Sequence, residues 1–363
     1  MKHAFYRCAT GLGVLGLALV LFTSISAAQT DTPACRELGI AKLMPSPAYH
    51  EDRTLFSRQW NASERRQEIR RSQDGGLTWE LVLSDPWIFH VALSPAFGSD
   101  QTVLALVDVG AAVSHDGGQT WRDLTLPGAA TSDSNAVITA GGTWFVRLHA
   151  GRPGGYDPLR EGVFVSTDEG VTWRQLYSGK VYALAASPLY EQDQTLFISP
   201  GGYKANYGIY RSTDGGVTWH ESNTGLAWGG EYHVGTIAFS SAYAQDQTIY
   251  VRSNSLLHRS ADAGVSWQHI VVGEAAHGYD LIQDFVLSPR YPTDHTLWIH
   301  GGQYGFAVSR DAGATWQPLS QPIIPLVALD DCVGTNCTPT IVGRYHNNSM
   351  LYKSYNYGQT WQC

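Results

Sequence analysis

Two carboxylates, Glu231 and Asp280, lie in corresponding loops of neighbouring repeats of this 363-residue chain. Hydrolysis of a glycosidic bond needs one protonated acid and one base or nucleophile, about 5–5.5 Å apart for retention or about 6.5–9.5 Å for inversion. His233 and His277 occupy similar positions and could act as general bases or metal ligands. Because acids and histidines in surface loops are more often only solvated, glycoside hydrolysis is here the alternative hypothesis.

A larger set of aromatic residues occurs in the same loops, among glycines and polar residues. Aromatic rings of this kind suit the apolar faces of sugars or a loop of a partner protein. Gln59-Trp60-Asn61 and the insertion from His149 to Glu161 belong to these loops. We expect binding residues at Trp87, Tyr156, Tyr203, Tyr207, Trp228, Tyr232, His233, His277, Tyr279 and Tyr304.

Other chemical motifs are missing from the sequence. It contains no HExxH, no Gly-x-Ser-x-Gly, no glycine-rich phosphate loop and no CxxC. These are the spacings that mark zinc, serine-nucleophile, nucleotide and redox sites. We therefore expect neither a cofactor nor a metal.

The elements that must position these loops repeat seven times. In each copy a serine is followed by Asp or Asn, then Gly, then Trp, as in Ser72, Asp74, Gly76 and Trp79. The Asp side chain can cap a tight turn by accepting amides two or three residues on, the Gly can take a positive φ, and the Trp can fill the core. We expect these turn residues to be structural: Asp74, Asp116, Asp168, Asp214, Asp262, Asp311 and Asn356.

The repeat length indicates the architecture. Successive Asp or Asn residues are 42 to 52 positions apart, as in four-stranded propeller blades. A second element, Ser-Pro-x-Tyr-x-x-Asp or close to it, precedes five copies and begins at Ser46 in the first. We place it in the loop between strands A and B, and the Asp-containing turn between strands C and D. The sequence thus predicts an all-β fold, a single seven-bladed β-propeller of four-stranded antiparallel blades, over residues 29–363.

The third and seventh blades lack the second element. In the third blade, the loop around Val137–Trp144 is simply shortened. In a propeller, A–B and C–D connections share one face, and B–C and D–A connections share the other. The irregular loops all belong to the second face, where we expect binding or catalysis.

The N-terminus indicates export. Lys2 and Arg7 precede an apolar stretch over residues 11–22 and a small-residue cleavage site at Ser26–Ala28. Residues 1–28 are therefore predicted to be a cleaved signal peptide, too short in its apolar part to remain as a membrane anchor. We expect a secreted or cell-envelope (periplasmic) protein, and a monomer. Removing two cations changes the net charge from −8 to about −10, which argues against a nucleic-acid partner.

Four cysteines follow the predicted signal peptide, and an even number in an oxidising compartment favours two disulfides. Cys332 and Cys337 flank a short loop, so we expect them to pair. The other bridge would then join Cys35 to Cys363, at the first and last positions of the repeat array. Such a bridge would tie the ring shut.

The Ser-x-Asp-x-Gly-x-Thr-Trp box resembles the Asp-box, or BNR, repeat. The whole mature chain is similar to Asp-box propellers, which include sialidases, tandem-ring xyloglucan hydrolases and photosystem II assembly factors. The sialidase resemblance implies an Arg-Ile-Pro motif in the first blade, and none occurs here. The xyloglucan hydrolases have two rings, whereas this chain has residues for one, so in length and blade number it looks most like the assembly factors. We expect a protein- or glycan-binding module that uses its B–C and D–A loops.

Overall fold

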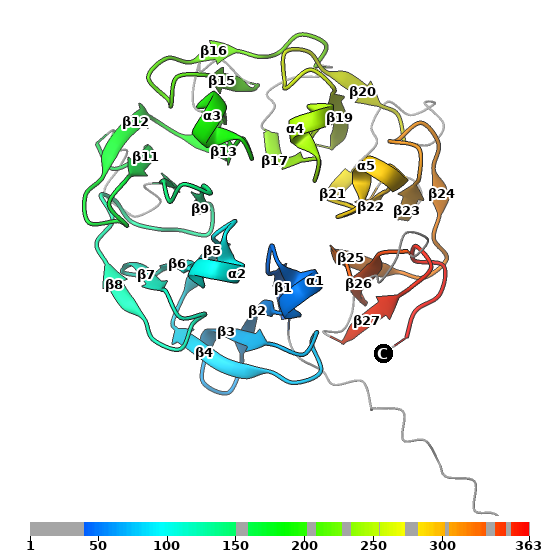
Figure 1. The fold of residues 1–363 in the computed structure, drawn as a ribbon, viewed down its shortest axis with the longest axis horizontal. Helices are drawn as coiled ribbons and strands as arrows, with labels where there is room; N and C mark the ends of the chain where they lie inside the picture. The colour runs from blue at the N-terminus through cyan, green and yellow to red at the C-terminus, as the bar shows by residue number, and fades with distance from the viewer. Residues whose placement is uncertain are drawn as a thin grey trace, which may run out of the picture. The chain divides into compact units, whose positions relative to one another are not determined.

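The computed structural model describes residues 40–149, 159–201, 208–226, 234–253, 255–272, 282–301, 305–331, 338–345 and 350–362. The chain divides into two compact units, Met1–Ala34 and Cys35–Cys363, and all the described residues lie in the second. This second unit consists of seven antiparallel sheets that follow one another around a ring (Figure 1). Within the ranges given above, no helix is long and apolar enough to cross a membrane.

Each sheet is built from consecutive strands, in chain order from the inside of the ring outwards (Figure 1). The first three sheets comprise β1 (Ile40–Pro45), β2 (Leu55–Asn61), β3 (Arg66–Ser72) and β4 (Glu80–Asp85); β5 (Ile88–Leu93), β6 (Val103–Val107), β7 (Gly110–Ser114) and β8 (Arg122–Leu124); and β9 (Asn135–Ile138), β10 (Trp144–Leu148), β11 (Gly162–Ser166) and β12 (Arg174–Ser178). The next three comprise β13 (Val181–Ala186), β14 (Leu196–Pro200), β15 (Tyr210–Ser212) and β16 (His220–Glu221); β17 (Val234–Phe239), β18 (Ile249–Ser253), β19 (Leu256–Ser260) and β20 (Gln268–Ile270); and β21 (Ile282–Leu287), β22 (Leu297–Gly301), β23 (Phe306–Ser309) and β24 (Gln317–Pro318).

The seventh sheet differs from the prediction of four strands. It contains β25 (Ile323–Leu329), β26 (Thr340–Tyr345) and β27 (Leu351–Ser354). A single bridge between Lys353 and Gln362 stands where the fourth strand would pair. The seven-bladed β-propeller is otherwise as predicted, with six four-stranded sheets.

The Ser-Pro-x-Tyr-x-x-Asp element forms one turn of helix, where the sequence predicts only a loop. In the first copy the Asp52 carboxylate accepts hydrogen bonds from the Ser46 hydroxyl at 2.6 Å and the Thr54 amide at 2.7 Å, while Tyr49 is buried. The five helices are α1 (Tyr49–Asp52), α2 (Phe97–Asp100), α3 (Tyr190–Asp193), α4 (Tyr243–Asp246) and α5 (Tyr291–Asp294). In the third sheet a tight turn, closed by a bond from the Thr139 amide to the Thr143 carbonyl, replaces the helix. This is the shortened loop that the sequence predicts.

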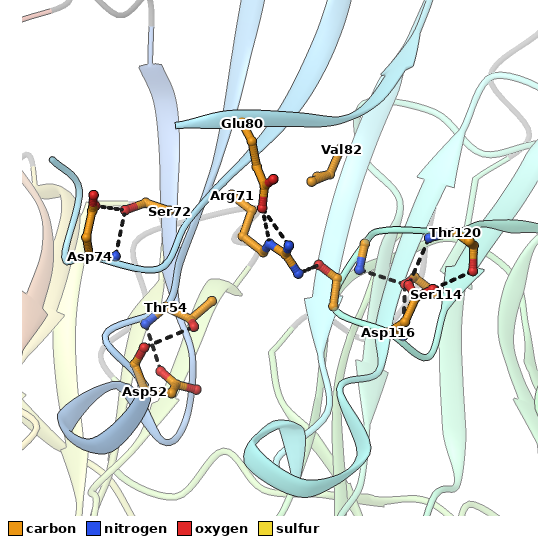
Figure 2. Close-up of polar contacts among 12 residues, drawn as sticks. Asp52, Thr54, Arg71, Ser72, Asp74, Glu80, Val82, Ser114, Asp116 and Thr120 are labelled. Atoms are coloured by element: carbon orange, nitrogen blue, oxygen red, sulfur yellow. Dashed lines mark hydrogen bonds and ion pairs between the residues drawn. The ribbon is translucent and has the colours of Figure 1, made fainter. Parts of the chain in front are cut away.

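The Asp-box turn is a closed set of hydrogen bonds (Figure 2). In the second copy, Asp116 accepts the amide and the hydroxyl of Thr120, at 2.9 and 2.5 Å. Ser114 donates its hydroxyl to Asp116 and accepts the amide of Gly118, both at 2.7 Å. Gly118 has φ of +95°. Box aspartates accept amides from residues three and four positions on. The sequence predicts two or three, so the bond at three is confirmed and the one at four is additional.

The apolar core is divided among the seven interfaces between adjacent sheets. Each interface holds one hydrophobic cluster, and each cluster contains one Asp-box tryptophan. The predicted core role of these tryptophans is thereby confirmed. In chain order they are Trp79, Trp121, Trp173, Trp219, Trp267, Trp316 and Trp361.

The Asp-box turns also join adjacent sheets through hydrogen bonds. In five copies, the carbonyl of the residue directly after the Asp or Asn accepts a side-chain donor from the preceding sheet, and this residue has a positive φ in each copy. The bond from Arg71 to the Gly117 carbonyl is shown in Figure 2. The five donor–acceptor pairs are Lys353–Gly75, Arg71–Gly117, Arg122–Glu169, Tyr250–Ala312 and Trp298–Tyr357.

Candidate functional site

Two exposed tryptophans, Trp60 and Trp87, stack on one another at the seam between the first and second sheets. Their ring centroids are 6.1 Å apart with an interplanar angle of 30°. Trp60 is 45% exposed and Trp87 is 49% exposed. We call these two residues the tryptophan pair. Trp60 and Trp87 are the tryptophans among the exposed large hydrophobic residues of the described part of the chain, so the pair is a candidate contact surface.

The strands place the tryptophan pair on the face of the B–C and D–A connections. Trp60 is the penultimate residue of β2, next to the hairpin at 62–65, whereas the sequence predicts a loop at this position. Trp87 follows β4 and directly precedes β5. The pair therefore lies opposite the face of α1 and the Asp-box turns. This is the face on which the sequence predicts a site.

Hydrogen bonds fix the connection that carries Trp87. Its amide donates to Asp85 Oδ1 at 3.1 Å, and the next amide, of Ile88, donates to Gln67 Oε1 at 3.1 Å. Because its backbone is held on both sides, Trp87 needs little ordering when a ligand binds. The surface is thus pre-organised.

A buried carboxylate supports the strand that carries Trp60. Glu68 lies on β3 and accepts bonds from Asn61 at 2.6 Å, Gln59 at 3.1 Å and Arg70 at 2.9 Å. Burial opposes ionisation, but these hydrogen bonds outweigh it and hold the pKa of Glu68 below its usual value. A carboxylate in this state stays charged and has its lone pairs occupied. Glu68 therefore positions the strand end and is unsuited to act as a general acid.

Arg58 connects the tryptophan pair to the inner wall of the ring. It lies two residues before Trp60 and therefore on the same side of β2. Its Nη1 donates to the Ile88 carbonyl at 3.0 Å and to the Phe89 carbonyl at 2.5 Å. These carbonyls lie at the register shift between Ile88 and His90 in β5. Arg58 thus donates to the backbone at the bulge, where the regular pairing of β5 with β6 is interrupted.

A second polar pair, His149 and Glu161, lies on the same face in the third sheet. His149 Nδ1 and Glu161 Oε1 are 2.5 Å apart, and Glu161 is buried. An imidazole oriented by a buried carboxylate is a common arrangement for a base or a metal ligand. Among the described residues, however, no group of three His, Cys, Asp or Glu side chains could hold a metal ion. The sequence analysis included both residues in one loop but did not predict their contact.

Of the binding residues predicted from the sequence, only Trp87 belongs to the described part of the chain. The carboxylates Glu231 and Asp280 fall outside it, and so do the four cysteines. The other predicted residues outside it are Tyr156, Tyr203, Tyr207, Trp228, Tyr232, His233, His277, Tyr279 and Tyr304. Their roles stay predictions. Sequence analysis missed Trp60 as a site residue, although its loop was singled out, because the contact with Trp87 depends on how two sheets pack.

Comparisons with known proteins agree with this fold. The BNR/Asp-box repeat model matches residues 112–123 and 210–221. No curated protein matches the chain. Among solved structures, a GH74 xyloglucanase from Xanthomonas campestris is 17% identical, with a TM-score of 0.56 over 90% of this chain, which spans only 60% of the xyloglucanase.

Two YCF48 structures match over nearly their full length. YCF48 bound to D1 peptide is 16% identical, with a TM-score of 0.54 over 89% of this chain and 96% of its own. YCF48 from Cyanidioschyzon merolae is 12% identical, with a TM-score of 0.56 over 88% of this chain and 98% of its own. At these identities the similarity establishes the fold alone. The chain contains BNR/Asp-box repeats and has a seven-bladed β-propeller fold that is structurally similar to YCF48 and the GH74 enzymes.

Proposed function

We propose that this propeller is an exported binding module that holds a segment of a partner protein on the tryptophan pair. The observation that carries the proposal is the exposed stack of Trp60 and Trp87 on the face of irregular loops. Tryptophan is among the residues most enriched at the energetic centres of protein interfaces. Export follows from the predicted signal peptide.

The comparisons favour a protein partner over a glycan. The chain spans almost the whole of two YCF48 structures, one of which contains a bound D1 peptide. It spans only 60% and 65% of two GH74 enzymes. The glycoside hydrolase with Glu231 and Asp280 as its acids is the alternative.

Selection from a displayed peptide library on the immobilised mature protein tests the proposal. We expect selected peptides to bind the wild type and to bind Trp60→Ala and Trp87→Ala at least about 30-fold more weakly, since a central interface tryptophan contributes about 2 kcal/mol or more. Leu77→Ala is the control, because Leu77 is 76% exposed on the opposite face. Peptides that bind the double tryptophan variant as well as the wild type would exclude this surface.

A glycan panel, with sialosides included, tests the alternative. Intact glycans that are retained by the wild type and lost with Trp60→Ala would show a lectin-like module instead. Shortened glycans in the eluate, abolished by Glu231→Gln or Asp280→Asn, would show a hydrolase.

A further inference from the structure

We propose that Lys42 and Arg58 form a binding site for a carboxylate of the ligand that lies on the tryptophan pair. This inference rests on the proposed function and adds the chemistry of the ligand. Lys42 in β1 stands directly opposite Arg58 in β2 in the strand register. Like charges opposite one another in an antiparallel pair destabilise a sheet. An anion between them would remove that cost.

Neither cation forms an ion pair with an acid in the part of the chain that the structure describes. The hydrogen bonds of the Arg58 guanidinium go to the uncharged carbonyls of Ile88 and Phe89. Lys42 is exposed and has no hydrogen bond or ion pair with any described residue. The contact with the bulge in β5 accounts for the position of Arg58, whereas no hydrogen bond or ion pair among the described residues accounts for that of Lys42.

Of two neighbouring basic side chains, Arg147 adds positive charge near Lys42 and Arg58, whereas His90 does not. Burial, reinforced by Lys42, Arg58 and Arg147, lowers the pKa of His90 to about 3, so His90 is neutral at pH 7. Its imidazole is hydrogen-bonded to the backbone of Ala136. Arg147 donates to the Val181 carbonyl at 2.7 Å and to Asn135 at 3.1 Å, so it also has uncharged partners.

Two acids face this group without forming an ion pair with it. Although the Lys42 side chain is accessible to solvent, enough protein atoms lie around it that desolvation, followed by the charge of Arg58, lowers its pKa, while Asp284 on β21 opposes that shift. Asp133 acts in the same way on Arg147, whose pKa burial lowers to about 10. Three cations are therefore gathered here with no ion-paired acid among the described residues, in a chain whose net charge is −8. Such a site attracts anions.

The cations and the tryptophan pair are continuous. Arg58 and Trp60 are neighbours on one side of β2, about 7 Å apart along the strand. Arg58 also bonds the carbonyl of Ile88, the residue after Trp87. A peptide that packs an apolar side chain on the indoles could therefore place an adjacent Asp or Glu side chain at Lys42. The ligand class is an acidic, aromatic-binding peptide segment.

Unfolding measurements with simple anions test the site without any partner. Citrate at low millimolar concentration, compared with chloride at equal ionic strength, should raise the unfolding temperature of the wild type, because a ligand that binds only the folded state stabilises it. Lys42→Met should lose at least tenfold in citrate affinity, and Lys42→Arg should recover most of it. Lys180→Met is the control, since Lys180 packs on Tyr182 in the fourth sheet.

Two results would overturn the site. Equal effects of citrate on the wild type and Lys42→Met would show that no anion binds there. A Lys42→Met protein that unfolds at lower urea concentration in chloride would show a structural lysine, because the proposal expects equal or greater stability once the like-charge pair is removed. If inorganic phosphate bound more tightly than citrate, the site would prefer a phosphate group and its assignment to a carboxylate would be wrong.

The selected peptides distinguish the two possible sources of the carboxylate. Replacing a peptide Asp by Asn should weaken binding to the wild type at least tenfold and leave binding to Lys42→Met almost unchanged. The Asp-to-Asn change could leave peptide affinity unaltered while citrate binding still requires Lys42. The site would then bind a free carboxylic acid, and the proposal of a peptide carboxylate would be wrong. If no peptide binds while citrate does, the proposed function fails and the anion site stands.

Discussion

The aspartate of an Asp box is a charged group whose environment favours its ionised form. At Asp168, the hydroxyl and amide of Thr172 and the hydroxyl of Ser166 lower the pKa to about 2. At Asp74, partial burial opposes ionisation, but hydrogen bonds from Thr78 and Ser72 again lower the pKa to about 2. The seventh copy shows that the charge is not needed to make the turn. There the Asn356 amide oxygen accepts the Thr360 amide at 2.9 Å, and its Nδ2 donates to the Thr360 hydroxyl at 2.9 Å.

The box aspartates should make the protein sensitive to acid. Their pKa is lower in the folded protein than the value of about 3.9 in an unfolded chain. Between about pH 4 and pH 2 the unfolded state therefore binds more protons, and stability falls as the pH is lowered through this range. Urea unfolding at pH 5 and pH 3 should show a smaller loss for Asp168→Asn than for the wild type. An equal loss in both proteins would mean that other carboxylates carry the acid sensitivity.

Glycine at the position after the box aspartate should stabilise the folded protein. This position has a positive φ in all seven copies, and Glu169 has φ of +56°. The left-handed conformation costs a residue with a Cβ atom about 1–2 kcal/mol, part of which the greater freedom of glycine in the unfolded chain offsets. Urea unfolding should therefore find Glu169→Gly more stable than Glu169→Ala by about 1 kcal/mol. The alanine variant also lacks the exposed contact with His115, so the difference isolates the backbone. If Glu169→Ala were more stable than Glu169→Gly, the proposed backbone strain at residue 169 would be refuted.

At the scale of elements, the contact between an outer strand and the next Asp box should contribute to stability. Arg71 is 6% exposed and donates to the Gly117 carbonyl at 2.8 Å and to Glu80 at 2.6 Å. Arg71→Met should cost about 1–3 kcal/mol in urea unfolding, because it leaves a buried carbonyl without a donor. Arg122→Met is the matched control: its bond to the Glu169 carbonyl is exposed and 3.4 Å long. That change should cost less than about 0.5 kcal/mol. Equal costs would show that burial does not decide the strength of these contacts.

The elements that the sequence predicts well are those with local causes. The Asp box makes its hydrogen bonds within five residues, from Ser114 to Gly118 for example, so its residue types alone indicate the turn. The Trp60–Trp87 stack and the contact of Arg58 with β5 join residues 27 and more positions apart. They depend on how the sheets pack and where the bulge falls in β5. No local pattern encodes them, so the part of the candidate site that lies between sheets could not be predicted.

At the scale of the whole molecule, the ring closes between the seventh and first sheets without exchanging a strand in the described part of the chain. A hydrophobic cluster that includes Leu43, Leu55, Leu329 and Val342 forms this interface, and Lys353 donates to the Gly75 carbonyl at 3.0 Å. The seventh sheet has only three strands. This closing interface therefore joins a four-stranded sheet to a three-stranded one. A covalent bond between the two sheets would stabilise it.

The predicted bridge between Cys35 and Cys363 would supply that bond. It would close a loop of more than 300 residues, for which loop entropy alone gives roughly 5 kcal/mol, less any strain. Peptide mapping without reductant should find Cys35 joined to Cys363.

Hydrogen exchange on the Cys35→Ser/Cys363→Ser variant tests where the bridge acts. Amides of β1 and β25 should exchange faster than in the wild type, because opening should begin at the closing interface. Amides of β9 and β13 should change little. If amides exchanged faster to the same extent throughout the ring, the bridge would stabilise the whole fold and not the closing interface in particular. A bond from Cys35 to Cys332 would refute ring closure by disulfide, and the apolar cluster and Lys353 would then hold the ends together.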